Sequence, residues 1–261
     1  MFHYEWKKLV SKKLLCVIFV FFAYIFIDYL FFQESDTWRQ WFISYTFDIK
    51  LMYGLLIFIL SPMFSREKEL EMFDLIVVSK RGVTDLPKKK LLVSFAAANL
   101  MLLIFCVLSY VSFGISHSIW DWNVPIDDAM LQAFLSNADI VTYKDMLSQV
   151  LFNSFLSINL VAALTLFVSS KCKQSVQTVI IVFAVNFVFG AKVVVTVLQT
   201  AWAQYVAISL PVNMIWNNVL NTDSVLIGGW RIQAIYIVQI LYFLIILVLY
   251  RLICITYKHR R

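Results

Sequence analysis

Residues 65–90, SREKELEMFDLIVVSKRGVTDLPKKK, interrupt the apolar runs of this chain with a long polar stretch that carries a helical pattern of its own. If residues 65–79 are helical, acidic side chains lie along one face and apolar side chains along the opposite face. The two faces consist of Glu67, Glu71 and Asp74 and of Leu70, Phe73 and Val77. The stretch therefore predicts a short amphipathic helix.

Local signals indicate where this helix begins and ends. Pro62 separates it from the preceding apolar run, because proline lacks a backbone N–H and clashes with the turn before it. Lys80 and Arg81 follow its last turn, where a helix dipole favours cations, and Gly82 is suited to end it. The pattern alone fits a membrane-surface helix or a solvated connector as well as a contact for a partner.

The composition of the chain indicates a membrane protein. Of its 261 residues, 61% are hydrophobic and 15% are charged, and the mean hydropathy is +0.80, unlike a soluble globular domain. An apolar run of about 20 residues crosses a bilayer core of roughly 30 Å. We therefore expect an all-α integral membrane protein in one transmembrane domain, residues 1–261. The predicted spans are residues 14–32, 43–64, 91–115, 147–169, 176–198 and 232–256.

Two connections between the later spans have distinct patterns. The turn SKCKQ, residues 170–174, is short enough to join spans four and five as a tight helical hairpin. Residues 199–231 mix apolar and polar side chains and contain Pro211. We expect this segment to form short helices that lie in or dip into the outer leaflet before span six.

The positive charges predict the orientation in the membrane. Of the 22 lysines and arginines, 17 fall in the amino-terminal segment, residues 65–90, the 171–173 turn and the segment from Arg251 onward. Because cytoplasmic loops are enriched in positive charge, these segments and both termini are predicted to be cytoplasmic in a plasma membrane. The net charge of +6 thus reflects topology, and no basic domain for nucleic acid is expected.

The sequence lacks the motifs of a nucleotide-hydrolysing or metal-dependent enzyme. Its six glycines form no phosphate-binding loop followed by lysine and serine or threonine. The three histidines lie outside the predicted spans, and the four cysteines have no CxxC spacing, so we expect no metal site. The chain is therefore expected to have no enzymatic activity and no cofactor of its own.

Several polar side chains fall inside the predicted spans. Asp28, Lys50 and Lys192 share a depth near the outer side, and Asn153 and Asn186 lie in spans four and five. Charges in hydrocarbon often mark a pathway, so these residues could line a substrate path. They could also snorkel, pair or tie helices together, and this structural role is preferred here.

The stretch FSREKELEMFDLIVVSKRGVTDLPKKKL, residues 64–91, is the most specific local pattern in the chain. With the six spans and the segment ISLPVNMIWNNV, residues 208–219, it resembles the permease subunit of an ABC-2 type ABC transporter. The matching positions are Glu67, Glu69, Glu71, Leu75, Ser79, Arg81 and Lys90. The chain departs from the family pattern where a glycine usually follows the acidic pair, because Met72 and Phe73 stand there.

This resemblance implies that the amphipathic helix is a coupling helix, which rests in a groove of a separate ATPase subunit. The permease would work as a dimer, with a second copy or a paralogue, and with two ATPase copies that hold ATP and Mg²⁺. The residues expected at the ATPase contact are Glu67, Leu70, Glu71, Phe73, Asp74, Val77 and Arg81. Phe73 with Leu70 and Val77 would fill the groove, while the acidic residues would meet basic groups at its rim.

The function expected from this resemblance is export of an amphipathic or hydrophobic substrate. The outer loops are short, and the spans offer mainly aromatic and aliphatic surface. A toxic or antimicrobial peptide is the first choice of substrate, with a drug or lipid second. The alternative is a membrane immunity or sensor protein that binds its ligand in the bilayer without transporting it.

Overall fold

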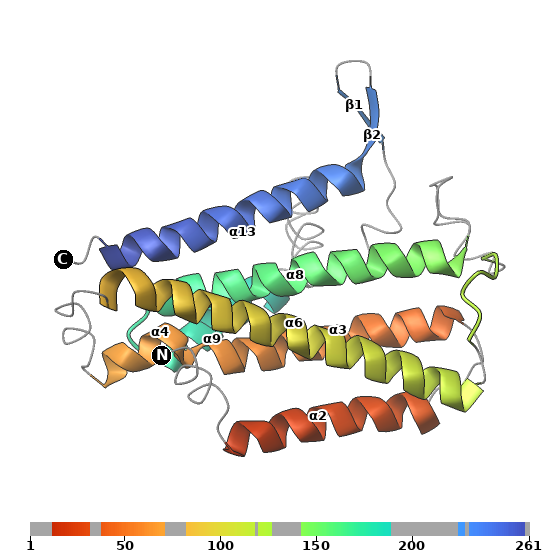
Figure 1. Ribbon diagram of the computed structural model, residues 1–261, viewed down its shortest axis with the longest axis horizontal. Coiled ribbons are helices and arrows are strands. Elements are labelled where there is room, and N and C mark those ends of the chain that lie inside the picture. The colour runs from red at the N-terminus through yellow and green to blue at the C-terminus, as the bar shows by residue number, and fades with distance from the viewer. Residues whose placement is uncertain are drawn as a thin grey trace.

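The computed structural model describes residues 12–31, 38–70, 82–117, 120–126, 142–188, 224–227 and 230–258. These residues are predominantly helical, as predicted (Figure 1). The elements are α2 (Lys12–Phe31), α3 (Trp38–Leu60), α4 (Pro62–Glu69), α6 (Gly82–His117), α8 (Tyr143–Lys171), α9 (Ser175–Phe183), the π-helical turn η1 (Ala184–Val188), β1 (Ser224–Ile227), β2 (Trp230–Gln233) and α13 (Ala234–Lys258).

The long helices run side by side, with α2 along one edge of the view and α13 along the other (Figure 1). Helix α8 contacts α3, α4, α6, α9 and α13. In the most apolar 18-residue stretch of α8, 72% is buried inside the protein, against 28% in the corresponding stretch of α13. Helix α8 is therefore the central helix of the bundle. We call the end of the bundle that carries α4 the α4 end, and the end that carries residues 120–126 the loop end.

Four helices in the described part of the chain are long and apolar enough to cross a membrane. They cover Ser44–Glu69, Asp85–His117, Tyr143–Lys171 and Tyr236–Thr256. The outward side chains of α13, such as Ile240, Phe243 and Val248, are large, apolar and exposed. A contiguous apolar surface of this kind suits lipid rather than water, so the fold is compatible with a membrane protein.

The expectation of six spans is met in part. Helix α2 lies in the first predicted span, but its apolar part, Leu15–Phe31, is shorter than the four helices above. The same holds for the apolar helix Ser175–Phe187 in the fifth predicted span. The second half of the fifth span, and Lys192 with it, lies outside the described residues. The predicted hairpin of spans four and five is present up to that point, because α8 and α9 are joined at residues 172–174 and pack together.

The first residues of the predicted amphipathic helix, 65–69, belong to α4. Helix α4 starts at Pro62, directly after the break that this proline was expected to cause, and ends at Glu69. The N–H of Leu70 then bonds the carbonyl of Arg66 at 3.0 Å. Proline is accepted at the first helical position because the N–H there has no intrahelical acceptor. Residues 71–81 lie outside the described part of the chain.

Two further expectations about this stretch are wrong. Gly82, expected to end a helix, is the first residue of α6, and α6 starts nine residues before the predicted span at residue 91. Lys88, Lys89 and Lys90 therefore lie within the helix, and Lys90 is buried. Glycine is tolerated at the start of a helix. Packing against the rest of the bundle stabilises α6 beyond its most apolar segment.

The segment before α13 is partly strand rather than helix. Strands β1 and β2 pair in antiparallel register, with Ser224 opposite Gln233 and Ile227 opposite Trp230. The sequence between them is Gly228–Gly229, a dipeptide favoured in two-residue hairpin turns. The prediction of helices over residues 199–231 is therefore wrong for the last residues of this segment, which form strands. The rest of the segment lies outside the described part of the chain.

The loop at residues 120–126 is fastened to the start of α8. Lys144 donates its N–H to the carbonyl of Trp122 at 2.8 Å, and Tyr143 donates to Val124 at 3.2 Å. Thr142 and Asp145 form a capping box that begins α8 at this point. Trp122 is thereby held over the loop end of the bundle.

Candidate functional site at the junction of α4, α6 and the α8–α9 turn

The junction at the α4 end is built on one face of α4, which carries serines one turn apart. Ser61 and Ser65 are four residues apart, so their side chains lie on the same face. The Ser65 hydroxyl donates to the Ser61 carbonyl at 2.9 Å and also contacts the Ser175 hydroxyl at 3.0 Å. Both residues are buried. Small polar side chains allow α8 and α9 to approach the backbone of α4 closely.

Ser169 of α8 caps the first turn of α4 from outside the helix. Its hydroxyl accepts from the N–H groups of Phe64 at 3.2 Å and Ser65 at 3.1 Å, and donates to the Ser61 carbonyl at 2.6 Å. The helix has no side-chain cap of its own, because Ser61 makes no such hydrogen bond. A residue from a different helix thus binds the first-turn amides that a helix leaves unpaired.

Lys68 and Glu69 bind the two helix ends that meet at the α8–α9 turn. The Lys68 Nζ donates to the carbonyls of Ser170 at 2.6 Å and Cys172 at 2.9 Å. The Glu69 carboxylate accepts from the N–H of Ser175 at 2.5 Å and from its hydroxyl at 3.0 Å. The cation therefore lies at the negative end of the α8 dipole and the anion at the positive end of the α9 dipole.

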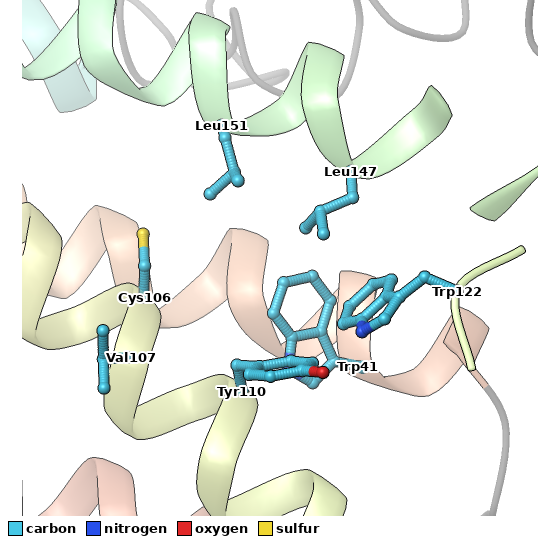
Figure 2. A pocket seen from close by; sticks show the side chains of 7 residues that line it. All are labelled: Trp41, Cys106, Val107, Tyr110, Trp122, Leu147 and Leu151. Atoms are coloured by element: carbon cyan, nitrogen blue, oxygen red, sulfur yellow. The ribbon is translucent and has the colours of Figure 1, made fainter. Parts of the chain in front are cut away.

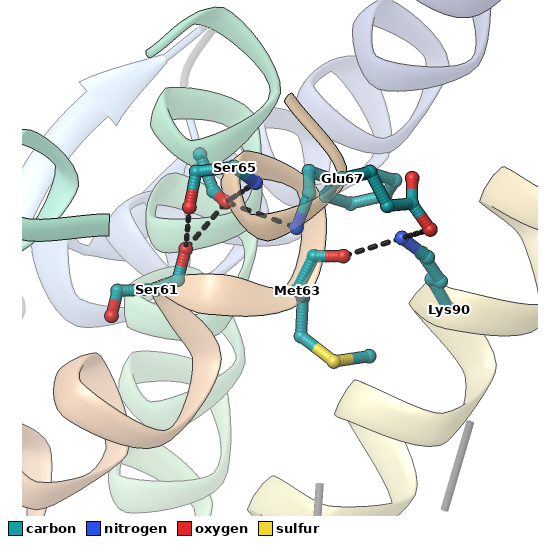
Figure 3. Close-up of polar contacts among 7 residues, drawn as sticks. Ser61, Met63, Ser65, Glu67 and Lys90 are labelled. Atoms are coloured by element: carbon teal, nitrogen blue, oxygen red, sulfur yellow. Dashed lines mark hydrogen bonds and ion pairs between the residues drawn. The ribbon is translucent and has the colours of Figure 1, made fainter. Parts of the chain in front are cut away.

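Glu67 and Lys90 form a buried ion pair between α4 and α6 (Figure 3). Glu67 is 6% exposed and Lys90 is 1% exposed. The Lys90 Nζ also donates to the Met63 carbonyl and lies 4.8 Å from the centre of the Phe64 ring. A buried charge needs such partners, because losing its hydration costs several kcal/mol.

Three consecutive residues of α4 thus contact three different elements. Glu67 binds α6, Lys68 binds the end of α8, and Glu69 binds the start of α9. A displacement of α4 must therefore move these helices or break charged hydrogen bonds. The junction is suited to transmit motion from the segment after α4 to the long helices.

Comparison of the chain with protein-family models, curated proteins and solved structures found no match. Within the described ranges, no group of three or more His, Cys, Asp or Glu side chains could hold a metal ion. The observations that bear on function are therefore the contacts of this chain itself.

Two of the seven predicted ATPase-contact residues lie within the described part of the chain. Glu67 faces the interior and not an exposed rim, so the expected position of this residue is wrong. Leu70 is 57% exposed, at the end of α4. The remaining five are Glu71, Phe73, Asp74, Val77 and Arg81, which lie outside the described residues.

The predicted polar residues of the spans are separated among several helices. Asp28 and Lys50 are half-buried, on α2 and α3 respectively. Asn153 is buried and accepts at 2.8 Å from Gln239, so it ties α8 to α13. Asn186 is buried in η1 and donates to the Val182 carbonyl one turn back at 2.8 Å.

Sequence reasoning missed the serines of the junction and the hydroxyl pairs of the core. Ser61, Ser65 and Ser169 were not singled out, although two serines flanking Pro62 at helical spacing were a usable signal. Tyr45 donates to Ser154 at 3.1 Å, and Tyr53 bonds Ser157, which joins α3 to α8 within the bundle. Asn99 and Asn159 exchange amide hydrogen bonds at 3.1 and 3.2 Å between α6 and α8.

Proposed function

We propose that this chain is the membrane permease subunit of an ATP-driven exporter of the ABC-2 type. It works as a dimer with two copies of a separate ATPase subunit, which binds ATP and Mg²⁺. It moves an amphipathic or hydrophobic substrate out of the cell, with a toxic or antimicrobial peptide as the first candidate.

The α4 junction is the observation that carries this proposal. The polar segment at residues 71–81 directly follows α4 in the sequence, and the charged residues of α4 bind α6, α8 and α9. A partner that pulls on residues 71–81 therefore acts on three helices at once. The clustering of positive charge in residues 65–90 supports a cytoplasmic position, where an ATPase is found.

The inward position of Glu67 narrows the proposed ATPase contact. Leu70 is the first exposed apolar residue of the segment, and Phe73 and Val77 continue the same helical face in the sequence. The proposed contact therefore consists of Leu70, Glu71, Phe73, Asp74, Val77 and Arg81, with the aromatic ring at its centre.

The test is co-purification with an ATPase encoded beside this chain. The isolated chain is expected to show no ATP hydrolysis, while the complex hydrolyses ATP at a rate that the substrate alters. Phe73→Asp should detach the ATPase at equal membrane abundance, because it puts a charge in an apolar groove. Glu71→Lys, the control, should weaken the association less and in a salt-dependent way.

Two results would contradict the proposal. Full ATPase binding and transport by Phe73→Asp would make the segment a connector with no coupling role. Ligand binding by the chain alone, with no ATPase that associates with it, would favour the immunity or sensor alternative.

A further inference from the structure

A pocket of about 360 Å³ lies at the loop end of the bundle (Figure 2). Cys106, Val107 and Tyr110 of α6 form one wall, and Leu147 and Leu151 of α8 form the facing wall. The rings of Trp41 of α3 and Trp122 of the 120–126 loop complete the lining.

The pocket lies between α6 and α8, which diverge toward this end in the view of Figure 1. Nearer the middle of the bundle, the Asn99–Asn159 pair joins the same two helices. Beyond that pair, Trp41 packs against Trp122, with ring centres 5.5 Å apart and at right angles. Trp122 also lies 5.2 Å from the Tyr110 ring. These rings hold the helices apart and leave the space open between them.

The polar groups of the lining are largely occupied by the protein itself. The indole N–H of Trp41 donates to the Ser109 carbonyl at 3.3 Å, and the Cys106 thiol contacts the Tyr45 hydroxyl at 3.4 Å. The lining contains no charged side chain. A ligand would therefore be recognised through apolar contact, and an apolar cavity of this kind favours hydrocarbon over water.

The position of the pocket indicates the source of the hydrocarbon. Val107 is 52% exposed and belongs to the outward apolar face of α6, together with Leu103 one turn away. In a bilayer this face meets lipid chains, so the pocket borders the hydrocarbon phase. Tryptophan and tyrosine at its outer end are typical of the membrane interface. Its volume is at the low end for ligand pockets, which run from about 300 to 1,000 Å³.

We infer that this pocket binds one acyl chain of a membrane lipid, which enters between α6 and α8. The inference rests on the membrane location in the proposed function but not on transport or on an ATPase. A lipid chain fits the apolar lining, the narrow volume and the border with lipid together. A folded peptide is too wide for the space, and a charged ligand would lose its hydration without gaining a partner.

The test uses the full chain in nanodiscs that contain a phospholipid with a diazirine in the middle of one acyl chain. After illumination, adducts are mapped by mass spectrometry, with adducts on the exposed face of α13 as an internal reference. We expect adducts on the pocket-lining residues of α6 and α8. Leu151→Trp should abolish them, because the indole fills the pocket from the α8 wall.

The matched control is Phe152→Trp, the next residue of α8, which is exposed and does not line the pocket. This variant should keep the pocket adducts. If Leu151→Trp does not fold, Val107→Trp fills the space from α6, with Leu103→Trp as its control. Pocket adducts that persist in the filling variants, or an unaltered chain that carries adducts on α13 but none in the pocket, would overturn the inference. Either result leaves the ATPase experiment unaffected, so the two proposals fail separately.

Discussion

At the residue scale, the Glu67–Lys90 pair is the most consequential charge interaction in the described part of the junction. Both side chains are almost fully buried, and Lys90 additionally contacts Met63 and Phe64. Removing one partner leaves the other charge buried without its counter-ion, and this costs about 3–5 kcal/mol. The pair therefore matters for the integrity of the junction, even though Glu67 cannot contact a partner protein at an outer rim.

Lys90→Met is expected to destabilise the chain by roughly 3 kcal/mol or more, because it leaves the buried Glu67 carboxylate without its counter-ion. The measurement is thermal unfolding in detergent, in which size-exclusion chromatography monitors the loss of folded protein. Lys88→Met on the exposed side of the same helix is the control and should have little effect. The double change Glu67→Gln with Lys90→Met should be less destabilising than the sum of the single changes. Strict additivity would show that the two side chains do not interact.

Two glycines in long helices are expected to respond oppositely to alanine. A Cβ at Gly114 would lie 2.6 Å from the Trp120 ring, so Gly114→Ala must displace that ring from its edge contact with Tyr110. A Cβ at Gly54 meets nothing within 4 Å, and Gly54→Ala should stabilise α3 by about 0.5–1 kcal/mol. Thermal unfolding with tryptophan fluorescence checks both. Equal stabilisation by the two changes would contradict the close approach of Trp120.

At the element scale, α4 depends on residues outside itself. It is eight residues long, and an isolated helix of this length is not stable in water. Its first turn is capped by Ser169 of α8 and its last turn binds the ends of α8 and α9. Helix α4 therefore behaves as an extension of the α8–α9 hairpin in any motion that reaches it.

Ser169→Ala is expected to destabilise α4 locally by about 0.5–2 kcal/mol, because the N–H groups of Phe64 and Ser65 lose their acceptor. Amide hydrogen exchange should become faster in α4 with little change in α13. Ser148→Ala is the control, since its hydroxyl is exposed and bonds only the Asp145 carbonyl of its own helix. Unchanged exchange in α4 would show that Ser169 does not cap it.

At the scale of the whole molecule, the two candidate sites lie at opposite ends of the bundle. The α4 junction holds the charged contacts, and the loop end holds the aromatic pocket. The helices that connect them are joined by buried hydroxyl and amide pairs, such as Tyr45–Ser154 and Gln239–Asn153. Motion imposed at one end can therefore reach the other through packed helices.

The proposed orientation is tested with single cysteines in a variant that lacks the four native ones. Asn123→Cys in the loop at residues 120–126 should react with an impermeant thiol reagent added to intact cells, whereas Lys173→Cys in the α8–α9 turn should not. Both positions are exposed in the structure, so burial does not explain a difference. Labelling of Lys173→Cys from outside would reverse the orientation, and equal labelling would contradict an odd number of spans between the two sites.

The sequence by itself was sufficient to predict a predominantly helical fold and the position of most of the described helices. An apolar run long enough to cross a bilayer is a local property of the chain, so the predicted spans at residues 43–64, 147–169 and 232–256 overlap most of α3, α8 and α13. The break at Pro62 was likewise predictable, because proline acts on its own backbone.

Only the tertiary structure determines that α8 is central, that Glu67 faces inward and that α6 extends back to Gly82. The bond from Ser169 to Ser61 joins residues 108 apart, and that from Ser175 to Glu69 joins residues 106 apart. The helical period of the 65–79 stretch shows which residues share a face but not which neighbour that face meets. The partner of a buried charge comes from a distant part of the chain, so the local pattern could not show it. The family resemblance implied that Glu67 meets a second protein, whereas packing places it against Lys90.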